Sequence, residues 1–189
     1  MPHTIRTFIA IQLPERIISA AEQIQNKLKT ANADVKWVEP KNIHLTLKFL
    51  GNISVERLKA VEDMMIKCAS NVARCSARLD GLGVFPSLER LDILWIGVHE
   101  KTGRLAAMVK MLEDQLAVVG FPKEDRAFTS HITLGRARSA NSTKELTEKL
   151  KTVEILDGDF EINELTLLQS FLSSSGPTYV PLFKAPLKI

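Results

Sequence analysis

The chain has 189 residues, of which 45% are hydrophobic and 25% are charged, with 25 lysines and arginines against 22 aspartates and glutamates. This size and composition suit one compact globular domain, or two small lobes that share a core. No apolar run is long enough to span a membrane and the N-terminus shows no signal-peptide pattern, so we expect a cytoplasmic protein without a membrane segment. The net charge of +3 fits a phosphate-bearing ligand but does not by itself indicate one.

The first half of the chain alternates between strand and helix patterns. Strands are indicated by apolar runs and helices by apolar residues that recur every three or four positions. Ser54 is a suitable N-cap for the second helix. In chain order we predict a strand at 5–13, a helix over 17–28, a short strand at 35–38, a strand at 42–50, a helix over 58–72 and a strand at 77–85.

The second half repeats this order. The helix after residue 140 opens with the capping-box pattern Ser142-Thr143-Lys144-Glu145. We predict a strand at 91–99, a helix over 105–116, a strand at 130–136, this capped helix, a hairpin-like pair within 153–171 and a last strand at 179–187.

One offset of 87 residues relates three separated segments of the sequence. His44-Leu45-Thr46-Leu47 recurs as His131-Ile132-Thr133-Leu134, Phe8-Ile9-Ala10-Ile11 recurs as Trp95-Ile96-Gly97-Val98, and 79–85 maps onto 166–172. Such self-similarity indicates an internal duplication. We therefore predict one α+β domain over 1–189 with halves near 1–88 and 89–189. Two lobes related by a pseudo-twofold axis would each pack helices on a mainly antiparallel sheet, with the active-site cleft between them.

The duplicated motif has the residue types for acid–base chemistry. On a strand, His44 and Thr46 point to one face and the leucines between them to the other, and His131 and Thr133 do the same. Two imidazoles that titrate near neutral pH can deprotonate a water on one side of a phosphate and protonate a leaving oxygen on the other. The threonine hydroxyls can donate hydrogen bonds to the phosphate oxygens, where charge accumulates.

A zinc site is the main alternative for histidines on strands. His3 and His99 match neither motif copy, and no cysteine or acidic residue repeats beside the pair. Cys68 and Cys75 have no zinc-ligand spacing. We therefore expect neither a metal nor another cofactor. An isolated His-x-Thr would be weak support for an active site, and it is the second copy that makes the pattern specific.

The chain resembles the 2H phosphoesterase superfamily, and within it the RNA 2′,3′-cyclic phosphodiesterase family, also called 2′-5′ RNA ligases or LigT-like proteins. The resemblance runs nearly end to end. It rests on the following segments: Arg6 to Ile11, Trp37 to Gly51, Phe85-Pro86-Ser87, Leu94 to Val98 and Phe128 to Arg136. It departs at Ser130, where the family commonly has proline directly before the second histidine.

This resemblance implies hydrolysis of RNA 2′,3′-cyclic phosphate ends to 2′-phosphomonoesters without ATP, and in some members the joining of tRNA halves through a 2′-5′ linkage. It implies that His44 is the proton donor to the leaving oxygen and His131 the proton acceptor from water. It also implies that Arg136 contacts the phosphate. Phe128 could stack on a base or belong to the core, and Lys48 could reach the rim of the cleft or be solvated.

Three functions remain open at this point: an RNA cyclic phosphodiesterase, an enzyme with the same site acting on another cyclic phosphate or on 2′-5′ oligoadenylates, and a binding module for RNA without turnover. We expect a monomer, since the duplication already builds a symmetric cleft within one chain.

Overall fold

The computed structural model describes residues 3–139, 143–155, 158–174 and 176–189. Most of the predicted strands and helices are present, which confirms the α+β class. The elements are β1 (Thr4–Gln12), α1 (Glu15–Lys29), β2 (Val35–Trp37), β3 (His44–Ser54), α2 (Leu58–Ala69), β4 (Cys75–Pro86), β5 (Leu91–His99), α3 (Arg104–Val118), β6 (His131–Ala137), α4 (Thr143–Thr152), β7 (Asp159–Ile162), β8 (Glu164–Ser173) and β9 (Gly176–Pro186).

Of the two predicted helix caps, the one at Ser54 is wrong and the other lies outside the described residues. Ser54 precedes a single 3₁₀ turn, Val55–Arg57, and its hydroxyl does not cap that turn, so the second α-helix begins only at Leu58. The capping box begins at Ser142, which lies outside the described residues. Among the described helices, none is both long enough and apolar enough to cross a membrane.

The strands of the described chain form one curled antiparallel sheet whose order is symmetric about its centre. The order is β7-β4-β5-β6-β3-β1-β8-β9, with β2 added beside β6. At the central junction Leu45 of β3 pairs with Ile132 of β6, two positions that are 87 residues apart. β1 and β5 also begin and end 87 residues apart. The pseudo-twofold axis therefore passes between the two strands that carry the motifs.

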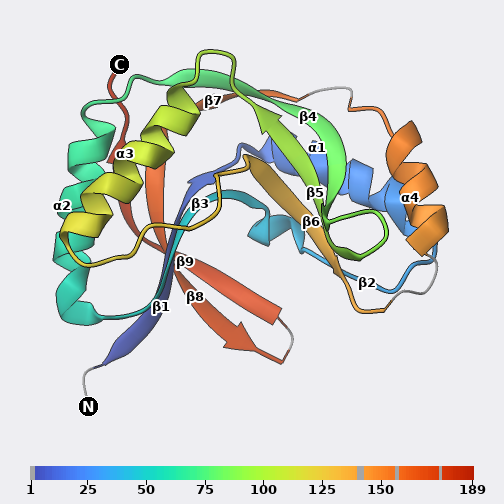
Figure 1. Cartoon of the computed structure of the whole chain (residues 1–189), viewed down its shortest axis with the longest axis horizontal. Helices are drawn as coiled ribbons and strands as arrows, with labels where there is room; N and C mark the ends of the chain where they lie inside the picture. The colour runs from blue at the N-terminus through green and yellow to red at the C-terminus, as the bar shows by residue number, and fades with distance from the viewer. Residues whose placement is uncertain (1–2, 140–142, 156–157, 175) are drawn as a thin grey trace.

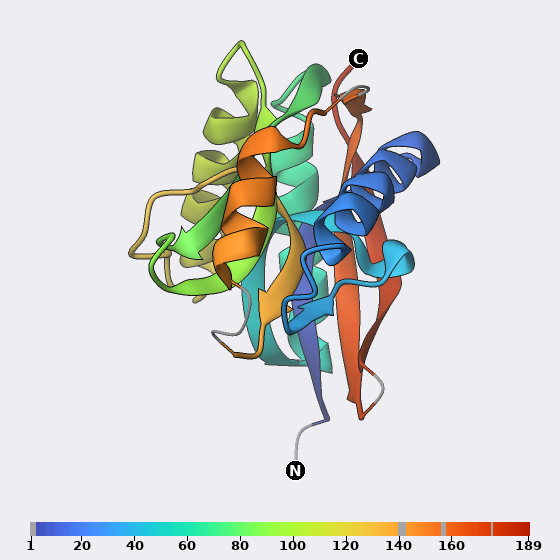
Figure 2. The same ribbon diagram turned by 90° about the vertical axis from the view of Figure 1, so that its right-hand side faces the viewer.

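The helices lie in two pairs at opposite ends of the sheet (Figure 1). α2 packs against α3, β8 and β9, while α4 contacts α1 and β4. Figure 2 shows α1 and α4 together on their side of the molecule. Each pair thus takes one helix from each half of the sequence. The first and last strands, β1 and β9, both belong to the half of the sheet covered by α2 and α3.

The expected hairpin within 153–171 is wrong. β7 pairs with β4 at one edge of the sheet, and β8 pairs with β1 and β9 near the other edge. Only Asn163 separates the two strands. The chain passes from one half of the sheet to the other at this residue without reversing direction. The alternation of apolar and polar residues identifies each strand but does not specify its partner.

Candidate active site

The four motif side chains gather on one face of the sheet at the pseudo-twofold axis. Because Leu45 pairs with Ile132 in antiparallel register, His44 lies opposite Thr133 and Thr46 lies opposite His131. The histidines therefore occupy one diagonal of a rectangle and the threonines the other, with diagonal neighbours about 7–8 Å apart in such sheets. All four line one cavity of about 420 Å³. A phosphate between the two imidazoles would have one on each side.

Both imidazoles are held by the same backbone hydrogen bond. Nδ1 of His44 lies 2.7 Å from the carbonyl oxygen of Asn42, and Nδ1 of His131 lies 2.7 Å from that of Thr129. A carbonyl oxygen only accepts, so Nδ1 carries the proton in each ring and Nε2 is left for the substrate. Asn42 is itself buried and donates its side-chain Nδ2 to the carbonyl of Pro177 at 2.8 Å.

Aromatic side chains support both histidines, and the support is partly symmetric. The ring centroid of His44 lies 4.9 Å from that of Phe8 and 5.2 Å from that of Tyr179. The ring of His131 lies 5.1 Å from Phe85 and 6.3 Å from Trp95. Burial lowers the pKa of His44, and the hydrogen bond to the Asn42 carbonyl only partly opposes this effect. Without an anion beside it, His44 therefore favours its neutral form.

Positive charge lines the same cavity. Arg6 of β1, Lys36 of β2 and Arg136 of β6 contribute to its wall. Glu39 also lines the cavity, but its carboxylate pairs with Lys41 at 2.9 Å. Burial raises the pKa of the Tyr179 hydroxyl, and the charges of Arg136 and Arg6 partly oppose that shift. An anion would be attracted to this wall.

Comparison with known proteins is decisive for the family. A family model described as LigT like Phosphoesterase matches the chain twice, over residues 11–95 and 96–179. The chain belongs to this family. It is 34% identical to the RNA 2′,3′-cyclic phosphodiesterase of Aquifex aeolicus, with 93% of both chains covered. It is 31% identical to the protein of that name from Methanothermobacter thermautotrophicus, with 93% of this chain and 95% of the relative covered.

Solved structures agree with this assignment. TT0787 of Thermus thermophilus superposes with a TM-score of 0.81 at 25% identity and covers 97% of this chain and 98% of its own. E. coli LigT in complex with 3′-AMP superposes with a TM-score of 0.78 at 27% identity, over 99% of this chain and 100% of that one. The curled sheet with two helix pairs is thus the LigT-like fold.

In this LigT-like chain Lys48 does not reach the cleft. Its ammonium is buried and contacts Glu113 Oε1 at 2.9 Å and the carbonyl of Pro122 at 2.7 Å. The cause is a β-bulge at Leu47: Thr46 pairs with Ala10 and Lys48 with Ile9, so β3 has one extra residue there. A bulge of this kind turns two successive side chains to the same face. The simple alternation that predicted Lys48 beside Thr46 is therefore wrong at this position.

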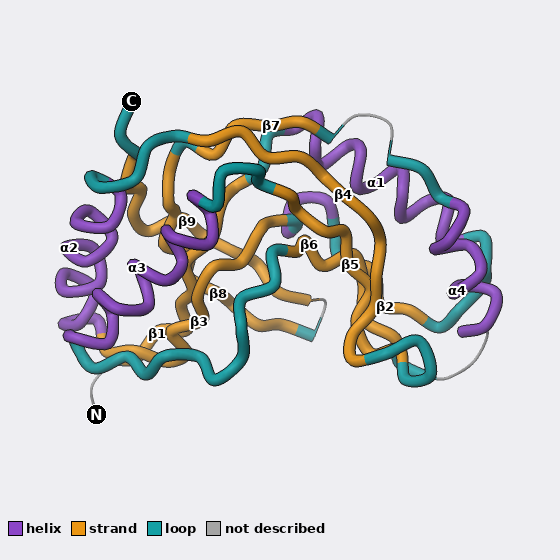
Figure 3. The backbone as a smooth tube through the Cα atoms, turned by 45° about the horizontal axis from the view of Figure 1, so that its top comes forward, coloured by secondary structure: helices purple, strands orange, loops and turns teal. Residues whose placement is uncertain are grey.

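Phe128 is also displaced from the predicted role. It packs against the hydrophobic core and does not line the cavity, so the base-stacking expectation is wrong and the core alternative holds. It lies in the segment 119–130, which runs from α3 to β6 without regular secondary structure (Figure 3). Arg136, in contrast, lines the cavity, where its contact with a phosphate stays a prediction.

Among the described residues, no group of three or more histidines, cysteines, aspartates or glutamates is placed to hold a metal ion.

Phe49 and Tyr179 are two of the cavity residues that the sequence did not predict as part of the site. Phe49 follows the bulge in β3, lines the cavity and is 59% exposed, which is unusual for a phenylalanine. It occupies the position equivalent to Arg136, which follows a matching bulge at Leu134 in β6. The repeat offset contained this signal, since it aligns Phe49 with Arg136. Tyr179 reaches His44 from a strand 135 residues later, and no local pattern indicates that contact.

Proposed function

We propose that this chain is an RNA 2′,3′-cyclic phosphodiesterase that hydrolyses cyclic phosphate ends to 2′-phosphomonoesters by two-histidine acid–base catalysis. The observation that carries the proposal is the pair of imidazoles related by the pseudo-twofold axis, each with Nε2 free and both lining one cavity. The names of the relatives support the substrate class, and the 3′-AMP complex of E. coli LigT supports a nucleotide ligand.

The proposed reaction uses the roles that the family resemblance implies for the two histidines, and the paired imidazoles support it. Nε2 of His131 accepts a proton from water as the water oxygen attacks phosphorus. The bond from phosphorus to the 3′ oxygen breaks on the opposite side, and Nε2–H of His44 gives that oxygen its proton. Thr46 and Thr133 donate hydrogen bonds to the non-bridging oxygens, and Arg136 offers a further cation to the phosphate region. The phosphate remains on the 2′ oxygen, and one proton has been taken up and one released.

The burial of His44 places a condition on its assignment as the proton donor. His44 must be protonated to act as the donor, whereas burial lowers its pKa. A cyclic phosphate carries one negative charge, and an opposite charge within about 4–6 Å favours the protonated imidazole. Substrate binding therefore raises the pKa of His44 and prepares it as the acid. The hydrogen bond that holds His131 lies in a more exposed environment than the one that holds His44.

The test uses a short RNA with a 2′,3′-cyclic phosphate end and identifies the monophosphate that forms. His44→Ala and His131→Ala are each expected to lower kcat by about 10²–10⁴-fold, the usual contribution of general acid–base catalysis. His99→Ala is the matched control, because His99 lies at the end of β5 and does not line the cavity. Activity is expected to persist in EDTA. Full activity in either motif variant contradicts the mechanism, and a 3′-phosphate product contradicts the leaving oxygen.

The same groups allow the reverse reaction, in which the 5′ hydroxyl of a second RNA replaces water and a 2′-5′ linkage forms. Ligation of tRNA halves is therefore part of the proposal as a side activity. A panel with ADP-ribose cyclic phosphate and 2′-5′ oligoadenylates separates the alternative substrates. RNA binding without turnover of any of these compounds would support the non-catalytic alternative instead.

We also propose that the protein acts as a monomer in the cytoplasm and folds as a single domain over 1–189, with halves near 1–88 and 89–189. Each helix pair combines one helix from each half, which supports one folding unit. Both motifs line one cavity within a single chain, so a second chain is not needed to complete the site. Cys68 and Cys75 are buried free thiols whose pKa is raised by burial to about 11, as expected of packing residues in a reducing compartment.

A further inference from the structure

Two cations stand directly opposite each other beside the catalytic cleft. Lys36 of β2 and Arg136 of β6 are register partners, so their side chains point to the same face. Both are exposed and both line the cavity. Neither forms an ion pair with a carboxylate in the described part of the chain. Like charges directly opposite on paired strands are destabilising, which favours an anionic ligand between them.

The strand that carries Lys36 is firmly held, although it is only three residues long. Val38 N–H donates to the carbonyl of Leu134 and Arg138 N–H donates to that of Asp34, both at 2.9 Å. The buried side chain of Gln25 donates to the carbonyls of Val38 and Leu134, both at 2.8 Å. The two cations are therefore presented by rigid backbone and not by a mobile loop.

Gly135 makes this docking possible. A Cβ atom at this position would lie 2.6 Å from Val35 Cγ1 and 3.2 Å from Trp37 Cε3. Both neighbours belong to β2, so glycine lets β2 lie closely against β6. In the other repeat the equivalent position is Lys48, whose side chain enters the core. The two motif strands therefore differ at this position, and the glycine in β6 allows β2 to pair with it.

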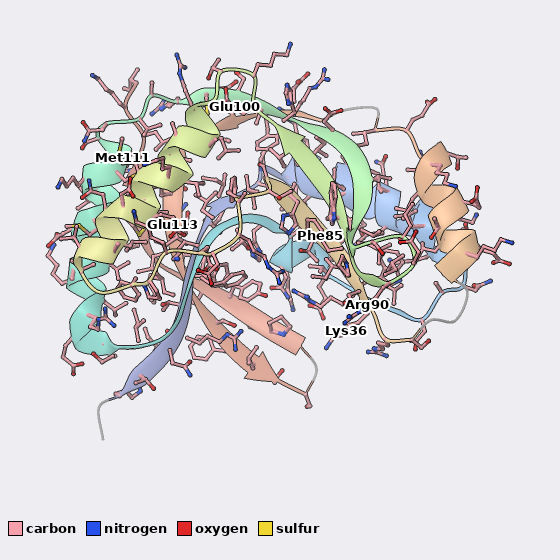
Figure 4. The ribbon with its side chains drawn as sticks, in the orientation of Figure 1. Lys36, Phe85, Arg90, Glu100, Met111 and Glu113 are labelled. Atoms are coloured by element: carbon pink, nitrogen blue, oxygen red, sulfur yellow. The ribbon has the colours of Figure 1, made fainter. Side chains whose placement is uncertain are left out.

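This additional strand breaks the symmetry of the cleft. The segment 122–124, which is 87 residues after β2, has no regular secondary structure. Phe49 stands where symmetry would place a second Arg136. Arg6 of β1 stands on the Phe49 side of the cavity, whereas the two register-paired cations stand on the other side, across β6 and β2. Figure 4 shows Lys36 on this side of the molecule, away from α2 and α3.

Within the pair, Arg136 lies nearer the axis, at the region of the reacting phosphate, and Lys36 is the outer cation. Arg136 follows Ile132, which marks the axis, by three ladder positions because of the bulge at Leu134, or about 10 Å of strand at 3.3 Å per residue. Lys36 lies one strand further out, about 4.8 Å beyond. On the basis of the proposed function, we propose that Lys36, with Arg136, binds the phosphodiester that joins the cyclic terminal nucleotide to the preceding nucleotide. The preferred substrate is then the end of an RNA strand and not a cyclic mononucleotide.

The experiment compares three substrates that share one cyclic end: a cyclic mononucleotide, a dinucleotide with a normal linkage, and the same dinucleotide with a neutral methylphosphonate linkage. The wild-type protein is expected to have its lowest KM for the normal dinucleotide. Lys36→Gln is expected to raise that KM about three- to fivefold, the range for an exposed ion pair, and to leave the cyclic mononucleotide unaffected. It should also reduce the salt dependence of log KM by about 0.7, because one phosphate contact is lost.

Lys41→Gln is the matched control, since Lys41 is an exposed lysine of the same segment that pairs with Glu39. The neutral linkage is expected to raise KM in the wild type and in Lys41→Gln, and to have little effect in Lys36→Gln. A Lys36→Gln protein that still distinguishes the charged from the neutral linkage as the wild type does would overturn the proposal. If the wild type opens none of the three substrates, the proposed function itself fails, which is a different result.

Discussion

Replacing Lys48 with methionine is expected to destabilise the fold and to leave substrate affinity unchanged. The ammonium group of Lys48 is 3% exposed and contacts Glu113, which is 13% exposed, at 2.9 Å. Figure 4 shows Glu113 on α3. A third contact, to Glu124 Oε1 at 3.4 Å, involves a carboxylate that is 58% exposed and is therefore screened by water. The consequence of the substitution thus depends mainly on Glu113 and on the Pro122 carbonyl.

The magnitude follows from leaving the Glu113 carboxylate without its cation. Removal of one partner from a buried ion pair costs about 3–5 kcal/mol. The lower end applies here, because Glu113 Oε2 still accepts the backbone N–H of Glu124 at 3.1 Å. A loss of about 3 kcal/mol in a chain of this size lowers Tm by about 6–12 °C.

Thermal denaturation of Lys48→Met and of the double variant Lys48→Met/Glu113→Gln measures this effect. The double variant should recover part of the lost stability, since no uncompensated charge remains. KM for a cyclic phosphate RNA, measured well below both transitions, should equal the wild-type value. A raised KM with an unchanged Tm would refute the structural role and return Lys48 to the substrate, as alternation along the strand suggested.

Three other substitutions test the site and its support. The pKa of His44 is lower in the folded protein than in the unfolded chain, so the unfolded chain binds a proton on this imidazole more readily. His44 therefore does not reduce the stability of the fold above the ordinary imidazole pKa, and reduces it as the pH falls below that value. The decrease in Tm between about pH 7 and 5 should be smaller in His44→Gln. Phe49→Ala should raise KM for cyclic nucleotides at least about fivefold if a base stacks there, and an unchanged KM excludes that contact. Gly135→Ala should lower the free energy of unfolding by about 1–3 kcal/mol through overpacking against Val35, as measured by urea denaturation, and equal stability would show that β2 moves without cost.

The repeat in the sequence predicted the centre of the site because both motif copies occupy equivalent places in a duplicated fold. The offset of 87 residues aligned His44 with His131, and the same offset relates the two residues that pair at the axis. It also aligned Phe8 with Trp95, which support the two imidazoles. A sequence pattern that is retained in both copies predicts position in the fold, because equivalent residues of the two halves have the same structural surroundings.

The parts that sequence reasoning did not predict depend on contacts without a local signal. The bulges at Leu47 and Leu134 change which side chains face the cleft, and alternation of residue types does not reveal them. The partners of β7 and β8 are selected by packing across the sheet, and the tight turn expected between them is absent. Exchange of helices between the halves is likewise a property of the assembled core and not of any one helix pattern.

Which histidine acts as the acid and which as the base must depend on residues that differ between the two repeats. His44 and His131 have the same hydrogen bond from Nδ1 and the same threonine two residues later, so the motifs alone make them interchangeable as acid and base. Their surroundings differ: Tyr179 and burial act on one imidazole, and the charged side formed by Arg136 and Lys36 extends from one end of the cleft. Under the proposed function, a substrate held by these asymmetric groups would present its leaving oxygen to His44. The duplication supplies the pair of histidines, and the proposed role of each member therefore depends on the differences between the copies.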